Sequence, residues 1–365
     1  MPLYRRKAGV WKQINIPPAG GGGGGGSSVT QATRDAQVFG TYKPNSRQLT
    51  GSFPGTTFNH VYPPTGSQTI QLTGTSYSNT TFWGLVRSSN AATFRNCRFV
   101  GADPASTQFN VLSGNVSNLG PTGGIPQVLT FFDCSFDSSD WIGDTPGRPL
   151  AATATRRINP NGNGIHGGNV ELYRCEITNV QDGINYTTGQ GTHAVLESCW
   201  IHRMYYQDNW YGPSDGRSHS DVFQFNHCKD LLIQNSVLGG NRVPEGYPAI
   251  TDPAWGTGSN LGDDAWNSCL MIKEEGTWVA ANAIDGVLIQ NNWFYGGQYA
   301  WNMFYQSDHP NTFAGMSLIN NKFGQRPASW GGGYIIKSPE ITATITGNTI
   351  EETGAPVPIS TGGSS

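Results

Sequence analysis

An eight-residue pattern recurs eight times along this chain, and it limits the fold more than any other feature of the sequence. In each copy the first and third positions are apolar and the second and fourth are variable. The fifth position is a turn residue, the sixth is small, the seventh is variable and the eighth is again apolar. Repeats of this kind are typical of architectures in which similar units stack on one another. The copies are 92–99, 129–136, 170–177, 194–201, 231–238, 287–294, 316–323 and 343–350.

The alternation within each copy predicts a strand with one buried face, then a turn and a second short strand. Successive copies are 24 to 56 residues apart. The shortest interval is about one coil of a parallel β-helix, and the longer intervals are a coil plus an inserted loop. A further short strand is predicted before the later copies, as at 164–166 and 221–225. We therefore predict an all-β fold, a right-handed parallel β-helix solenoid with loop insertions on one face.

The small residue occupies the same position in every copy, so stacked coils would align these residues in a ladder. Asparagine ladders exchange amide hydrogen bonds along a stack. Cysteines at this position are expected to be small buried fillers. Adjacent coils are about 4.8 Å apart, which is far for a disulfide, so free thiols are expected. The ladder residues are Cys97, Cys134, Cys175, Cys199, Ser236, Asn292, Asn321 and Asn348.

A family resemblance follows from these coils. The segment Ser218–Phe225, together with 231–236, resembles the right-handed parallel β-helix proteins of the pectate-lyase-like superfamily. The resemblance covers roughly residues 65–352. That superfamily includes lyases, hydrolases, epimerases and adhesins without enzymatic activity, so the resemblance implies the fold and leaves the chemistry open.

Composition divides the chain into five segments. The N-terminal tag alternates polar and apolar residues, and the linker after it contains seven consecutive glycines, which favour a flexible tether. The segment before the first coil is expected to cap its exposed edge. The predicted segments are the tag 1–16, the linker 17–28, the N-terminal cap 29–65, the β-helix 66–352 and the C-terminal tail 353–365.

The tag has a resemblance of its own. Its string Tyr4–Lys12 resembles the opening of minor tail proteins from phages of actinobacteria. The resemblance implies a virion protein of the phage tail, fibre-like or spike-like, that attaches to other tail proteins through residues 1–16. Tail spikes of this kind are usually homotrimers, although nothing in the coil pattern requires a trimer. The alternative is an unstructured leader that contains a tryptophan by chance.

Bulk properties exclude several other classes of function. The net charge is −3 and only 13% of residues are charged, so we expect no nucleic-acid partner, which would need a basic face. No apolar run approaches the roughly 18 residues of a membrane span, and no apolar segment follows the basic N-terminus as in a signal peptide. No Cys or His cluster indicates zinc, and no cofactor is expected.

Three long insertions are predicted to share one corner of the solenoid, at 137–163, 202–219 and 239–268. Insertions at one corner gather on one face, which is commonly the binding face. Aromatic rings beside carboxylates and arginines suit sugars, although the same rings could instead pack the loops onto the coils. The candidate substrate-binding residues are Tyr205, Tyr206, Trp210, Tyr211, Arg217, Trp255, Asp263, Asp264 and Trp266.

Asp182 and Asp221 are the candidate catalytic pair, because each precedes the first strand of its coil. Stacked in register, their carboxylates would be about 5 Å apart, the separation in a retaining glycosidase. The same pair is a fair calcium site. His219 would carry the proton. The alternative is that both aspartates cap local backbone amides, as they often do at strand starts. His166 is outward on a predicted strand, where a lone histidine is more often a turn residue.

The active-site motifs of superfamily polygalacturonases do not carry over to this chain. Ser220 and Asp221 match part of the first motif, whereas Asn267 and Ser268 occupy the place of the expected aspartate pair. The sequence therefore leaves two functions open. One is a tail protein whose loops bind host cell-surface polysaccharide, and the other is a glycoside hydrolase or lyase that degrades it.

Overall fold

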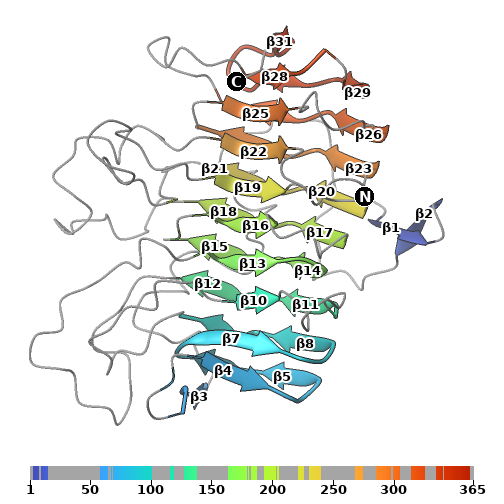
Figure 1. Ribbon diagram of the computed structural model, residues 1–365. Coiled ribbons are helices and arrows are strands. Elements are labelled where there is room, and N and C mark those ends of the chain that lie inside the picture. Colours follow the sequence, from blue (N-terminus) through green and yellow to red (C-terminus); the bar gives the residue numbers. More distant parts are fainter. Residues whose placement is uncertain are drawn as a thin grey trace, which may run out of the picture.

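The chain forms a parallel β-helix, shown in Figure 1. Three long parallel sheets run the length of the rod, and each coil contributes one strand to each sheet. The predicted fold, a right-handed parallel β-helix, is confirmed. The computed structural model describes residues 3–7, 10–14, 58–64, 67, 69–100, 116–118, 127–137, 163–178, 180, 182–186, 193–202, 204, 221–225, 230–239, 268–273, 285–296, 299–304, 314–324, 334–339 and 341–361.

The chain visits the sheets in a fixed order, which we number sheet 1, sheet 2 and sheet 3. Sheet 1 contains β4 (Thr69–Leu72), β7 (Leu85–Ser88), β10 (Val116–Asn118), β13 (Ile165–Gly167), β16 (Ile184–Tyr186), β19 (Asp221–Phe225), β22 (Ser268–Lys273), β25 (Tyr299–Phe304), β28 (Ile335–Lys337) and β31 (Ile359–Thr361). Sheet 2 contains β5 (Ser76–Ser78), β8 (Ala92–Arg95), β11 (Leu129–Phe132), β14 (Val170–Tyr173), β17 (His193–Glu197), β20 (Asp230–Gln234), β23 (Asp285–Gln290), β26 (Ala314–Ile319) and β29 (Ala343–Thr346). Sheet 3 contains β3 (Asn59–Val61), β6 (Thr80–Phe82), β9 (Arg98–Phe99), β12 (Ser135–Asp137), β15 (Glu176–Thr178), β18 (Trp200–His202), β21 (Val237–Gly239), β24 (Trp293–Tyr295), β27 (Lys322–Phe323) and β30 (Thr349–Ile350).

The recurring octapeptide is the unit that leads from sheet 2 into sheet 3. Its turn residue has a positive φ in every copy, a conformation that Asn and Asp tolerate better than most residues and that Gly adopts freely. A ninth unit, at 75–82, has the same turn with Asn79 in this conformation. The turn residues are Asn79, Asn96, Asp133, Arg174, Ser198, Asn235, Asn291, Asn320 and Gly347.

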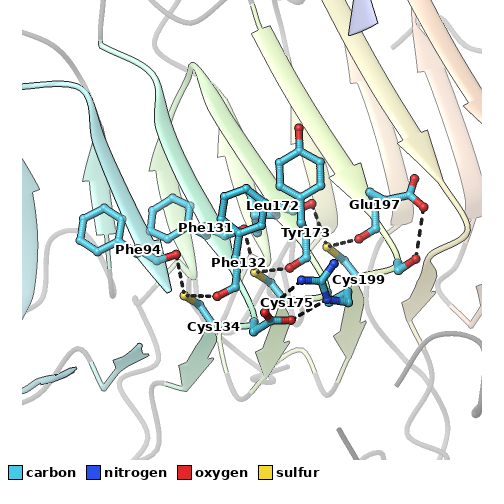
Figure 2. A network of polar contacts seen from close by, with 12 residues as sticks. Phe94, Phe131, Phe132, Cys134, Leu172, Tyr173, Cys175, Glu197 and Cys199 are labelled. Carbon is cyan, nitrogen blue, oxygen red and sulfur yellow. Dashed lines mark hydrogen bonds and ion pairs between the residues drawn. The ribbon is translucent and has the colours of Figure 1, made fainter. Parts of the chain in front are cut away.

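The residue after each turn forms the predicted ladder. At its asparagine end, Asn321 Nδ2 donates to Asn348 Oδ1 at 2.9 Å, and Asn292 Nδ2 donates to Asn321 Oδ1 at 3.0 Å. At its cysteine end, Figure 2 shows the thiols directed at carbonyl oxygens of their own and the preceding coil. The Cys134 thiol, for example, donates to Phe132 O at 3.2 Å. The ladder therefore satisfies backbone groups inside the rod, where water cannot reach them.

The four ladder cysteines are buried free thiols, as predicted, and Cys269 is buried as well. Burial raises the pKa of the Cys134 and Cys199 thiols well above the ordinary value for cysteine. Both thiols therefore stay protonated at neutral pH, and protonated thiols are poor nucleophiles.

Stacked aromatic rings fill the part of the core nearest the N-terminal coils. The rings of Phe94 and Phe131 stack with centroids 4.8 Å apart, and those of Phe99 and Phe136 do the same at 4.8 Å. All four side chains are fully buried. This stacking fixes the register between adjacent coils, because a ring in one coil packs on the equivalent ring of its neighbour.

Strands also occur in segments that the sequence assigns to the tag, the cap and the tail. The tag forms an antiparallel hairpin of β1 (Leu3–Lys7) and β2 (Val10–Ile14), which is a separate two-stranded sheet. β3 lies inside the predicted cap and pairs with β6, and β31 lies inside the predicted tail and pairs with β28. Within the described residues, no helix is long and apolar enough to cross a membrane.

Candidate functional site

The three long insertions leave the rod at one corner, as predicted. Each connects a strand of sheet 3 to the next strand of sheet 1: β12 to β13, β18 to β19 and β21 to β22. Most predicted site residues belong to the interiors of these insertions and lie outside the described residues. They are Tyr205, Tyr206, Trp210, Tyr211, Arg217, His219, Trp255, Asp263, Asp264 and Trp266.

Sheet 1 begins where these insertions end, and its outer face carries a row of polar side chains. Ile165, Ile184 and Phe223 point into the rod and are fully buried. Because side chains alternate along a strand, their neighbours point outward. Strand register places these neighbours side by side. We call this set the polar row: Arg87, Ser117, His166, Asn185 and Gln224.

Two members of the polar row have hydrogen-bonding capacity to spare. Ser117 Oγ and His166 Nδ1 are shielded from solvent and have no hydrogen-bond partner. These two residues are direct neighbours across β10 and β13. Burial, assisted by the charge of Arg87, lowers the pKa of His166, so its imidazole is neutral at pH 7. A neutral imidazole offers one donor and one acceptor, which matches a sugar hydroxyl.

Asn185 links the polar row to the candidate catalytic pair. Its Nδ2 donates to Gln224 Oε1 at 3.2 Å and to Asp182 Oδ2 at 2.8 Å. The other oxygen of Asp182 accepts the backbone N–H of Asp221 at 2.9 Å. Asp221 in turn accepts the Ser268 hydroxyl at 2.7 Å. These residues come from three successive coils, at the edge of sheet 1 that the insertions enter.

Asp182 and Asp221 thus occupy equivalent places in successive coils, as the sequence predicts. Their exposed fractions are only 5% and 1%, so neither carboxylate is open to solvent. The hydrogen bond from the Asp221 amide to Asp182 is that of a backbone cap. Catalysis by this pair with His219 remains a prediction.

Asp182 makes the stability of the rod depend on pH. Burial raises its pKa to about 6, although hydrogen bonds from the Asp221 amide and the Asn185 side chain lower it. The unfolded chain releases this proton near pH 3.9. The buried proton of Asp182 therefore contributes most to the free energy of unfolding below about pH 4, and this contribution is lost as the pH rises to about 6.

We expect the substitution Asp182→Asn to remove this pH dependence, because an amide cannot ionise. Between pH 4 and pH 7 the wild type should lose about 2 kcal/mol of unfolding free energy relative to the variant. Denaturant titrations of both proteins at several pH values measure the difference. Stability curves that stay parallel across this range would contradict the assignment.

Comparisons with protein-family models, curated proteins and solved structures found no match for this chain. Within the described part of the chain, no three His, Cys, Asp or Glu side chains are grouped so that they could hold a metal ion.

The polar row is the part of the site that sequence reasoning missed, apart from His166. The structure places His166 in the middle of β13, facing outward, and not in a turn. Arg87, Ser117 and Gln224 were overlooked although strand alternation carries the signal for them. Each lies next to an inward-facing, fully buried residue of sheet 1, namely Val86, Val116 and Phe223.

Proposed function

We propose that this protein is a phage minor tail protein, fibre-like or spike-like, whose β-helix displays loops that bind host cell-surface glycan. The observation that carries the proposal is that all three long insertions enter sheet 1 at one corner, beside the polar row. The insertions contain aromatic and charged residues, and the polar row beside their ends adds outward polar side chains, of which Arg87 is exposed. This combination suits a sugar chain, which needs rings for its C–H faces and polar partners for its hydroxyls.

The N-terminal hairpin supports placement in a tail. It is a small separate sheet, joined to the rod by a segment rich in glycine, as an attachment module on a tether would be. Its sequence resembles the opening of actinobacteriophage minor tail proteins. We therefore propose the virion as the location, other tail proteins as partners through residues 1–16, and a homotrimer as the assembly.

Binding can be tested with polysaccharide prepared from actinobacterial cell walls. Titration calorimetry should show saturable binding by the full chain. The double substitution Trp210→Ala and Tyr211→Ala should weaken binding about tenfold or more, because each lost ring contact contributes on the order of 1 kcal/mol. Ile359→Ala, at an exposed residue on the last strand, is the control and should bind normally. Equal affinities for both variants would contradict binding by the insertions.

A polysaccharide-degrading enzyme is the second candidate, because Asp182 and Asp221 occupy equivalent places in successive coils. The backbone cap on Asp182 and the burial of both carboxylates favour the adhesin instead. Release of reducing ends would indicate hydrolysis, and absorbance from an unsaturated product would indicate β-elimination. Loss of turnover in Asp221→Asn, with unchanged glycan affinity, would support catalysis by this pair. If the wild-type protein binds a polysaccharide and does not degrade it, the result would contradict the enzyme and support the adhesin.

A further inference from the structure

The outer face of sheet 2 has an apolar patch whose central side chains are buried. Side chains near both ends of the same face are exposed. Tyr173, Val195 and Leu232 form a cluster separate from the core of the rod, with exposed fractions of only 5%, 3% and 1%. Phe132 and Leu288 pack beside them and are half-buried. We call these five residues the sheet 2 patch. Along the same face, Arg95 near one end and Thr346 near the other are exposed.

Carboxylates surround the sheet 2 patch. Glu171 and Asp230 share one histidine, with His193 Nε2 3.1 Å from Glu171 Oε1 and His193 Nδ1 2.8 Å from Asp230 Oδ2. Glu197, the third carboxylate, has an exposed fraction of 9%, and its Oε2 has no hydrogen-bond partner. Although burial lowers it, hydrogen bonds to Asp230 and Glu171 raise the pKa of His193 to about 9, so its charge offsets one of the carboxylates. The patch therefore suits an occupant that is apolar on one side and supplies further positive charge.

The hairpin β1–β2 matches that description. Residues 1–16 include four basic residues and no acidic one. The register puts the apolar residues Leu3, Val10 and Ile14 at positions on the same face of the hairpin as Arg5 and Lys12. The strand register places Arg5 opposite Lys12, a pairing of like charges that destabilises a hairpin unless an anion compensates it. An isolated two-stranded hairpin is at best marginally stable in water and needs a surface to pack on.

The position of the hairpin along the rod fits the same face. In Figure 1 the hairpin is at the level of β17 and β20, the strands that carry Val195, Glu197 and Leu232. The segment 15–57 joins hairpin and rod, and at about 3.3 Å per residue it is long enough to reach this face.

We propose that the hairpin β1–β2 packs against the sheet 2 patch of its own chain, with its basic residues facing Glu171, Glu197 and Asp230. The apolar residues of the hairpin cover Tyr173, Val195 and Leu232, and its cations compensate the carboxylates around them. This inference goes beyond the proposed function and does not depend on glycan binding. It implies that the attachment module is held at the middle of the rod until a partner takes it up.

Hydrogen exchange of the full-length protein, followed by mass spectrometry, tests the proposal. The informative variant is Leu232→Lys, which places a cation in the centre of the patch. Ser317→Lys is the matched control, because Ser317 lies in the same outward row beyond the patch, two strands away. The amides of residues 3–14 should exchange at least about tenfold faster in Leu232→Lys than in the wild type, and at the wild-type rate in Ser317→Lys.

A second variant tests the charges without changing the rod. Arg5→Glu combined with Lys12→Glu should release the hairpin to the same extent, and it also decides the question if Leu232→Lys fails to fold. Wild-type amides that exchange as fast as those of an unfolded peptide, or protection that neither variant reduces, would overturn the proposal. Protection that increases with protein concentration would assign the hairpin to a second copy and would equally overturn docking within one chain.

Discussion

Replacing Asn321 with alanine is expected to destabilise the β-helix by about 4 kcal/mol, because it breaks the asparagine part of the ladder between Asn292 and Asn348. The Asn321 side chain accepts the backbone N–H of Asn292 at 3.0 Å and donates to Ile289 O at 3.1 Å. It also exchanges amide hydrogen bonds with Asn292 and Asn348. Alanine would leave these buried groups unsatisfied, and no water can reach them because Asn321 is fully buried.

Two controls isolate the ladder from a general effect of losing an amide. Asn90→Ala removes an exposed asparagine whose side chain donates one hydrogen bond, to Thr73 O, and should cost less than about 1 kcal/mol. Asn321→Ser introduces the residue found at the same position in the coil of Ser236, so it should recover part of the loss. Denaturant unfolding measures all three variants. If Asn321→Ala costs no more than Asn90→Ala, the ladder does not hold the coils together.

Gly183→Ala is expected to cost about 3 kcal/mol, because there is no room for a methyl group between the coils. A Cβ at this position would lie 2.3 Å from the carbonyl oxygen of Val222 and 2.5 Å from Ile201 Cγ2. The first contact is with backbone in the next coil, which cannot move without separating β16 from β19. The substitution should also disturb the polar row, since Asn185 and Gln224 lie on these two strands.

Gly354→Ala is the matched control for Gly183. Nothing lies within 4 Å of a Cβ built there, so only its φ of +69° opposes the substitution. That strain should cost about 1 kcal/mol. Thermal unfolding followed by circular dichroism compares the two variants. A Gly183→Ala protein that melts at the same temperature as Gly354→Ala would show that the coils are not packed as tightly as described.

The fold could be predicted from sequence because each unit encodes its own turn and its own ladder residue. The positive φ of Asn96, Asn291 and Asn320 and the burial of Cys97 follow from eight consecutive residues and need no distant partner. The ninth unit, at 75–82, is not predicted by the sequence pattern, because its first position is Thr75 and not an apolar residue. Local patterning is thus sufficient for a solenoid, in which every coil contacts only its neighbours.

The candidate site was less predictable, because its properties depend on contacts between coils. The stacking of Asp182 on Asp221 follows from equivalent positions, but the hydrogen bond that Asp221 accepts comes from Ser268, one coil further on. The spare hydrogen-bonding capacity of His166 likewise depends on which residues surround it. The insertions have no periodicity, so their sequence predicts which residues gather at the corner and not how they are arranged.

The connections between the sheets differ in a way that bears on how such a protein can change its target. Between sheet 2 and sheet 3, eight of the nine connections are two residues long and bear the ladder, as between Arg95 and Arg98. Between sheet 3 and sheet 1, the connection ranges from the short step after Phe82 to the long excursion that follows Gly239. New recognition segments can therefore be grafted at that second corner while the rod stays intact. A lineage of such proteins would be expected to exchange specificities there and to keep its scaffold unaltered.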